Sequence, residues 1–488
     1  MATNRPNIVL FVSDRQHADT IHAGGTEGIS TPHLDRLASD GVLFRRAYTT
    51  SPICSPARMA LLSGRYPHDN GMVANNQQRP GPDQMRYPSG VTNLAGYLGA
   101  QGYVSAYAGK WHLGSGSARP GFDALLAAGN DYDVDTPEQN DILRLTNRLG
   151  ITIGGKRSGH DVDRTRHDPE TDVGPQLLAL AHHPAHLFMD RATAWVRQRA
   201  AEPEPFFLMY SCIEPHPPFS APDPFHSIHR PQDMPLSPTR RDPAGAEWAA
   251  KRDDPFLRGK VSELSDEQLQ AVRAGYWGAV SYVDHLVGRL MTTLLDTDQW
   301  DNTLFIFTSD HGEMLGHHGL FGQYAVLYDD VIRIPLIVRP PGGLGRLHSS
   351  DQLISHVDLV PTLVSWCGGE PSDEVQGTDA GDLFRGGSAP INDGVVGSYH
   401  SANWTDPITP MRAWVTDGWK YVATQNGTDE LYDLAADPLE TTNLVADPAH
   451  QDTLTTMQRG LQSWQRETKD AWPEVARPSP QDQALRQR

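Results

Sequence analysis

The feature that most restricts the fold is a pair of continuous apolar runs, each of which ends in Ser-Asp. One run covers 8–12 and is followed by Asp14, and the other covers 304–307 and is followed by Asp310. A run without polar alternation is typical of a strand buried on both faces, as in a parallel sheet covered by helices. Ligands gather at the carboxyl ends of such strands, so we expect the two aspartates at one edge of the sheet.

Helical patterns alternate with the strand signals. Thr31-Pro32 predicts the start of a helix, with Thr31 as N-cap and Leu34 and Leu37 on the buried face. Ser265 and Gln268 predict a capping box for a long helix whose apolar residues recur at spacings of three and four. This alternation predicts an α/β fold with a largely parallel central sheet flanked by helices.

The chain is expected to divide into a large N-terminal domain, 1–387, and a smaller C-terminal region. Two stretches of the first domain, 115–175 and 217–254, have the composition of loops that shape an entrance. Short strand signals and a final amphipathic helix then predict an α+β region over 388–475. Residues 476–488 are a polar tail.

Composition excludes several classes of partner. The chain carries 60 acidic against 41 basic residues, a formal net charge of -19, and this leaves no cationic surplus for nucleic acid. It contains no apolar run of membrane-spanning length and no N-terminal leader pattern, so we expect no membrane association. Three cysteines do not make a disulfide framework. Together these features predict a cytoplasmic protein.

Cys54 lies in an unexpected place for a structural thiol. It follows a proline-bracketed loop, just ahead of a helical pattern and four residues before Arg58, and neither Cys212 nor Cys367 has a paired spacing with it. A lone cysteine in such a protein is usually an inert thiol in the core. Its position therefore needs a chemical reason.

The stretch "CSPARMALLSGR" resembles the first signature of the sulfatase family, in which the cysteine is oxidised to formylglycine by a formylglycine-generating enzyme. Further segments match the family in the same order: "GKWH" at 109–112, "EPHPPF" at 214–219, "SDHGEMLGHHGLFG" at 309–322, "HVDLVPTL" at 356–363 and "LYDLAADPLETTNL" at 431–444. The resemblance covers nearly the whole chain. It implies an alkaline-phosphatase-like core.

The resemblance also implies an activity, the hydrolysis of an aryl, alkyl or carbohydrate sulfate monoester to an alcohol and inorganic sulfate. The nucleophile would be the hydrated formylglycine, a gem-diol bound to one divalent metal ion. The implied metal ligands are Asp14, Asp310, His311 and the modified Cys54. The implied catalytic residues are the modified Cys54, Arg58 to hold the diol, Lys110 on the sulfate oxygens, His112 on the second hydroxyl, and His216 at the departing alcohol.

Three further positions are candidates for binding substrate. Many sulfatases have a second metal-binding aspartate where this chain has Arg15, and a guanidinium cannot ligate a cation. The smaller ligand set leaves Ca²⁺ and Mn²⁺ both open. Gln323 stands where relatives often carry a lysine, and we hypothesise that Arg15 supplies the missing charge. Asn75 lies where some relatives place a ligand-contacting asparagine.

Two other functions stay open on the sequence. The small number of metal ligands resembles that of phosphonate monoester hydrolases and choline sulfatases of the same superfamily. The site therefore also suits a phosphonate monoester or a phosphodiester. The other alternative is a catalytically silent binding protein that keeps Cys54 as a thiol, which the retention of the whole residue set argues against. The sequence identifies neither the alcohol nor the oligomeric state.

Several histidines and aromatic residues have no role implied by these motifs. No His-x-x-x-His helix with a glutamate accompanies the histidines, so they are interpreted as solvated or packing residues; they are His182, His183, His186, His317 and His318. Tyr107, Trp111 and Trp404 are candidate surfaces for stacking on a sugar or an aryl ring.

Overall fold

The computed structural model describes residues 5–75, 87–114, 119–130, 133–134, 179–242, 264–323, 326–400, 410–425 and 427–472. Most of the insertion expected at 115–175 lies outside these ranges, as do residues 243–254 of the second insertion. The tail at 476–488 and Trp404 also lie outside them. In the described part of the chain, no helix has the length and apolar character needed to cross a bilayer.

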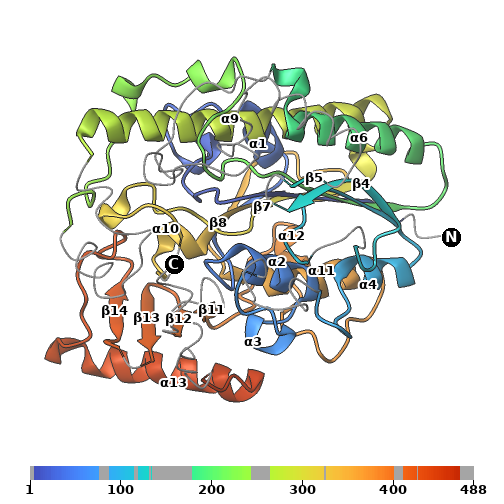
Figure 1. Ribbon diagram of the computed structural model, residues 1–488. Helices are drawn as coiled ribbons and strands as arrows, with labels where there is room; N and C mark the ends of the chain where they lie inside the picture. Colours follow the sequence, from blue (N-terminus) through green and yellow to red (C-terminus); the bar gives the residue numbers. More distant parts are fainter. Residues whose placement is uncertain are drawn as a thin grey trace, which may run out of the picture.

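A ten-stranded sheet forms the centre of the described structure (Figure 1). Its strands, in spatial order, are β10 (Ile354–Ser355), β2 (Val42–Tyr48), β8 (Arg333–Arg339), β7 (Thr303–Ser309), β1 (Asn7–Ser13), β6 (Phe206–Ser211), β3 (Val104–Lys110), β4 (Ala124–Asn130) and β5 (Asp133–Val134), with β9 (His348–Ser350) paired to β2. Neighbours from β7 to β4 run parallel, whereas β8 pairs antiparallel with β7 and with β2, and β5 pairs antiparallel with β4. The predicted, largely parallel sheet is confirmed.

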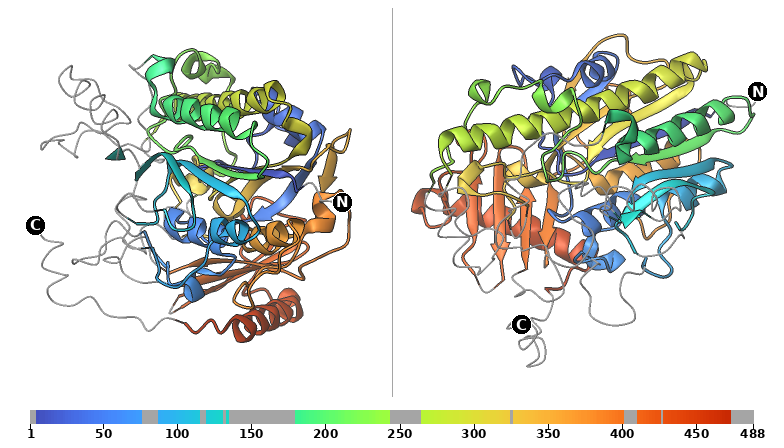
Figure 2. Two further views of the ribbon diagram at one scale, coloured as in Figure 1. Left: turned by 90° about the vertical axis from the view of Figure 1, so that its right-hand side faces the viewer. Right: turned by 45° about the horizontal axis from the view of Figure 1, so that its top comes forward.

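Helices cover both faces of this sheet, as Figures 1 and 2 show. One face carries α1 (Pro32–Ser39), α6 (Pro184–Arg199) and α9 (Asp266–Asp296), and the other carries α2 (Cys54–Ser63), α4 (Leu94–Ala100), α11 (Leu359–Trp366) and α12 (Gly381–Phe384). In β1, Ile8 and Leu10 join the core on the α2 side, while Val9 and Phe11 join the core on the α9 side. The run is apolar throughout because both of its faces are covered.

The remaining short elements connect these layers. They are α3 (Pro67–Asn70), α10 (Asp329–Ile332) and the 3₁₀ turns His22–Gly24, Leu180–His182, Phe225–Ser227, Pro231–Asp233, Trp300–Asn302, His317–Gly319, His356–Asp358 and Pro448–His450. Of these, α10 lies next to the segment that follows β7, because Gly312 N donates to Val331 O (2.7 Å).

One predicted cap is confirmed in full, and the other is confirmed in its position but not in its side-chain hydrogen bond. Ser265 and Gln268 form the capping box of α9. At α1, Thr31 has the N-cap position but caps nothing, since its hydroxyl accepts from His22 N (3.0 Å). The carboxylate of Asp284, in α9, takes the role by accepting from His33 N (3.0 Å) and Leu34 N (2.7 Å). A neighbouring helix therefore satisfies the free N–H groups of α1.

A separate antiparallel sheet forms the C-terminal α+β region, as the sequence predicts. It contains β11 (Val395–Tyr399), β12 (Met411–Val415), β13 (Trp419–Thr424) and β14 (Glu430–Asp433), with α13 (Gln451–Thr468) packed across it (Figure 1). A buried ion cluster joins this sheet to the main one. In it, Lys420 Nζ of β13 lies 2.6 Å from Asp329 Oδ1 of α10 and 2.7 Å from Glu440 Oε1.

Candidate active site

The ends of β1, β7 and the start of α2 meet in one buried cluster. Ser13 pairs with Ser309 in the parallel register of β1 and β7, so the next residues, Asp14 and Asp310, are neighbours at the carboxyl edge of the sheet. Cys54, the first residue of α2, and His311 complete the cluster. One ligand atom from each of these four buried side chains lies within 4.8 Å of the other three.

The donor set of this cluster fits a divalent metal ion. Asp14 Oδ1 is buried and has no hydrogen-bond partner among the described residues. His311 Nδ1 donates to Gly312 O (2.9 Å), which leaves the Nε2 lone pair facing Cys54 Sγ at 3.2 Å. Two carboxylates and one imidazole suit Mn²⁺, and the carboxylates also suit Ca²⁺.

Arg58 joins the two carboxylates of the cluster. Its Nε donates to Asp310 Oδ2 (2.8 Å) and its Nη2 to Asp14 Oδ2 (2.9 Å). Its Nη1 donates to Lys110 O (3.0 Å) and Ser211 Oγ (2.6 Å). The planar guanidinium suits two fixed acceptors, so in this structure Arg58 orients the Asp14 and Asp310 carboxylates. The sequence suggested only its contact with the diol.

Lys110 reaches the cluster from the end of β3. Its Nζ lies 2.7 Å from Asp14 Oδ2 and 4.0 Å from Cys54 Sγ, and the side chain is fully buried. The preceding Gly109 has φ of 106°, and a Cβ there would lie 1.8 Å from Ser211 O. Only glycine permits this close approach of β3 to β6 before the lysine enters the site.

Nearby charges and burial set the protonation of the cluster. Burial alone would raise the pKa of Asp14, but the positive charges of Lys110, His216 and Arg58 outweigh it and hold that pKa well below its usual range. Burial, followed by the Asp14 carboxylate, raises the pKa of the Cys54 thiol well above its usual range. An unmodified Cys54 is therefore a protonated thiol and a poor nucleophile.

Two predicted site residues contact the start of α2. The backbone carbonyl of His112, itself at φ of 54°, accepts from Ser55 Oγ (2.6 Å). Asn75 Oδ1 accepts from Ser55 N (3.1 Å). Both residues therefore lie beside the residue that follows Cys54.

Two other predicted residues come from more distant loops. His216 follows β6, and its Nδ1 donates to Pro217 O (2.7 Å), which leaves Nε2 as the ring position for proton transfer. Gln323 is buried, and its Oε1 accepts no hydrogen bond from a described residue. Gln323 Oε1 is therefore an acceptor to which no described residue donates, just after the segment that begins with Asp310.

Arg15 has a buried partner that the sequence did not reveal. Its backbone, at φ of 61°, donates from N to Asp310 Oδ1 (3.2 Å), and its Nη1 lies 3.1 Å from Glu313 Oε2. The other oxygen of Glu313 accepts from Leu315 N (3.4 Å) and Gly322 N. In the sequence, Glu313 was recognisable only as an acidic residue in the segment that follows Asp310. Glu313 is thus a positioning residue for Arg15.

A second cluster of possible ligands lies close to Arg15. His17, His317 and Asp330 have ligand atoms within 4.8 Å of one another. His17 Nδ1 accepts from Asp19 N (3.0 Å), so its Nε2 carries the proton that Asp330 Oδ1 accepts at 2.9 Å. A protonated Nε2 cannot ligate a metal, and we interpret the group as a hydrogen-bonded cluster.

Two further histidines without an assigned role, His183 and His318, contact tyrosine side chains. His183 is buried and its Nδ1 lies 3.1 Å from Tyr282 Oη. His318 stacks on Tyr328 with 4.1 Å between ring centroids. The idea that Tyr107 and Trp111 offer stacking surfaces is wrong, because both rings are buried core residues that pack edge to face on each other.

Comparisons with known proteins agree with this geometry. A family model described as Sulfatase matches residues 6–369, and one described as N-sulphoglucosamine sulphohydrolase, C-terminal, matches residues 316–467. The first match contains all four residues of the buried cluster. The second spans the end of the large sheet and the C-terminal sheet.

Individual relatives cover almost the whole chain. The protein named Uncharacterized sulfatase YidJ, from Escherichia coli strain K12, is 30% identical over 503 residues, covering 98% of this chain and 94% of that protein. A choline-sulfatase from Rhizobium meliloti strain 1021 is 27% identical and covers 96% of this chain and 89% of that protein. The crystal structure of a phosphonate monoester hydrolase from Agrobacterium radiobacter matches with a TM-score of 0.78 and 25% identity, over 95% of this chain and 96% of that one.

Proposed function

Since this chain belongs to the sulfatase family, we propose that it hydrolyses a sulfate monoester with a formylglycine made from Cys54 as the nucleophile. The observation that carries the proposal is the position of Cys54 at the start of α2. Its Sγ lies 3.2 Å from His311 Nε2 and 4.0 Å from Lys110 Nζ, beside the carboxylates of Asp14 and Asp310. A buried, protonated thiol has no evident use there unless it is converted.

Each step of the proposed reaction has a residue for it. The hydrated aldehyde at position 54 carries two hydroxyls. One of them gives up its proton to bulk water and attacks sulfur, and the bond between sulfur and the ester oxygen breaks. His216 donates a proton from Nε2 to that oxygen, and Lys110 stabilises the sulfate oxygens. His112 then takes the proton of the second hydroxyl, which expels sulfate and restores the aldehyde. Water hydrates the aldehyde again.

A divalent ion held by Asp14, Asp310, His311 and residue 54 would lower the pKa of the attacking hydroxyl and offset the charge of the sulfate. Arg58 contributes by holding both carboxylates in place, through its contacts of 2.8 and 2.9 Å. We further propose that Arg15, Asn75 and Gln323 bind substrate. A formylglycine-generating enzyme would act before folding, since Cys54 is buried in the folded chain.

The test is a mass spectrum of the tryptic peptide 47–58 from protein produced together with a formylglycine-generating enzyme. The proposal expects an aldehyde at Cys54. Cys212 is an internal control, because it is equally buried and free but lies outside the motif and should remain a thiol. An intact thiol at Cys54 under these conditions would contradict the mechanism and favour the silent binding protein.

A phosphonate monoester or a phosphodiester is the second candidate substrate. It is favoured by Arg15, which replaces a metal-ligating carboxylate, and by the fold match to a phosphonate monoester hydrolase. Sulfate esters and phosphonate monoesters are both tetrahedral and singly charged. The ratio of kcat/KM for 4-nitrophenyl sulfate to kcat/KM for 4-nitrophenyl phenylphosphonate decides which is the better substrate. The cytoplasmic location stays a prediction, which cell fractionation would test.

A further inference from the structure

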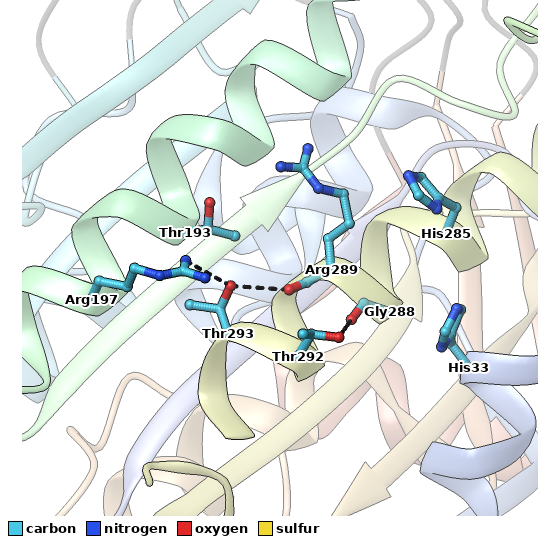
Figure 3. Close-up of a pocket in the computed structure, with 8 residues that line it drawn as sticks. All are labelled: His33, Thr193, Arg197, His285, Gly288, Arg289, Thr292 and Thr293. Carbon is cyan, nitrogen blue, oxygen red and sulfur yellow. Dashed lines mark hydrogen bonds between the residues drawn. The ribbon is translucent and has the colours of Figure 1, made fainter. Parts of the chain in front are cut away.

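We propose that a basic pocket between α6 and α9 binds a tetrahedral oxyanion, inorganic phosphate or sulfate. The pocket has a volume of about 280 Å³ and lies on the face of the sheet opposite α2 (Figure 3). Arg197 and Thr193 of α6 lie toward one end, His285 of α9 and His33 of α1 lie toward the other, and Arg289 of α9 stands between them. This site does not depend on the proposed sulfatase reaction.

All four titratable side chains of the lining are basic. The carboxylates that pair with the two arginines lie outside it: Asp296 is 3.4 Å from Arg197 Nη2, and Asp190 is 2.6 Å from Arg289 Nη2. Both pairs are partly exposed, and exposed pairs of this kind are weak, so either arginine can exchange its carboxylate for another anion.

The hydrogen-bond donors of Arg197 and Arg289 favour an anionic ligand. Arg197 Nη1 donates to Thr293 Oγ1 (3.2 Å), and Thr293 in turn donates to Arg289 O (3.1 Å), which orients the Arg197 fork on the pocket wall (Figure 3). The Nε–H groups of both arginines have no partner among the described residues. A phosphate or sulfate presents oxygens to such forks, often two at a time.

The two histidines are built into the other end of the pocket. His285 Nε2 is buried and has no hydrogen-bond partner in the described part of the chain. Burial, then the positive charges of Arg289, His186 and His33, lower the pKa of His285 to about 4. Burial is the largest cause of this depression, and the neighbouring positive charges add to it. An oxyanion in the pocket would offset those charges and accept from the imidazole.

Gly288 shows that the position of His33 is specified. A Cβ at this residue would lie 2.4 Å from the His33 ring, so only glycine lets the ring lie against α9. Glycine in a helix interior costs about 1 kcal/mol relative to alanine. The residue that makes room for the His33 ring is therefore one that a helix interior otherwise disfavours.

Calorimetric titrations of the folded protein with sodium phosphate and with sodium sulfate, at an ionic strength matched with sodium chloride, test the site. We expect binding that weakens about tenfold or more in an Arg197→Ala/Arg289→Ala variant, since each arginine contributes a charge-assisted hydrogen bond. The Arg199→Ala variant is the control, because Arg199 lies at the end of α6 and pairs with Glu204 (3.0 Å) outside the pocket. The two titrations show which oxyanion binds.

The candidate active site also attracts oxyanions, so the bound anion has to be located. Crystals soaked in selenate, an isostere of sulfate with an anomalous signal, should show a peak between Arg197 and Arg289. Turnover of the double variant should equal that of the wild type, which shows that the variant is folded. Equal affinities in wild type and double variant, or a selenate peak only beside Cys54, would overturn the proposal.

Discussion

Replacing Glu313 with glutamine is expected to lower kcat/KM by about 10- to 150-fold, because Arg15 loses the group that holds it. Arg15 Nη1 and Glu313 Oε2 are 3.1 Å apart, and the two side chains are 2% and 0% exposed, so water screens little of the interaction. A hydrogen bond to a charged group contributes about 1.5–3 kcal/mol, which corresponds to that range. The glutamine amide can turn only one acceptor to its surroundings, and the backbone N–H groups of Leu315 and Gly322 compete for it.

A double-mutant cycle measured with 4-nitrophenyl sulfate separates positioning from general damage. If Glu313 acts through Arg15, the Arg15→Ala/Glu313→Gln variant is no slower than Arg15→Ala alone, and the coupling energy is about 1.5–3 kcal/mol. The control is Asp233→Asn, which breaks the exposed pair with Arg230 (2.6 Å) and should leave kcat/KM unchanged. Additive losses in the cycle, or wild-type turnover in Glu313→Gln, would refute the reasoning.

Three further predictions concern stability, pH and metal. Lys420→Met leaves Asp329 and Glu440 without their buried cation, so the free energy of unfolding in urea should fall by about 3–5 kcal/mol; a loss under 1 kcal/mol would contradict this. Burial raises the pKa of Asp284 to about 7, so its contribution to stability is complete below about pH 4 and is lost as the pH rises through 7. Asp284→Asn, which keeps an acceptor for α1, should therefore gain stability relative to wild type as the pH rises from about 5 to 8, and a constant difference in urea unfolding argues against it. Chelation should abolish turnover, and add-back of Mn²⁺ or Ca²⁺ identifies the ion that restores it; full turnover after chelation would exclude the metal site.

The sequence alone determined two strands of the central sheet, several helices and the edge where chemistry is expected. The run at 8–12 and the run at 304–307 are recognisable because burial on both faces removes every polar residue from a strand. From that pattern it follows that Asp14 and Asp310 lie together, since parallel strands end at the same edge. The capping box of α9 was equally readable, because both of its partners lie within one helical turn.

Only the tertiary structure decided which distant groups hold these residues in place. Asp284 caps a helix some 250 positions away, Arg58 spans two carboxylates from separate strands, and Glu313 holds Arg15 across the same edge. Such hydrogen bonds depend on how distant segments are placed relative to one another. The spacing of residues within one segment does not specify that placement. Trp111, which the sequence suggested as a stacking surface, is buried because other elements pack over it. Local pattern fixes which face of an element is apolar, whereas the partners of its polar groups are set when the elements pack.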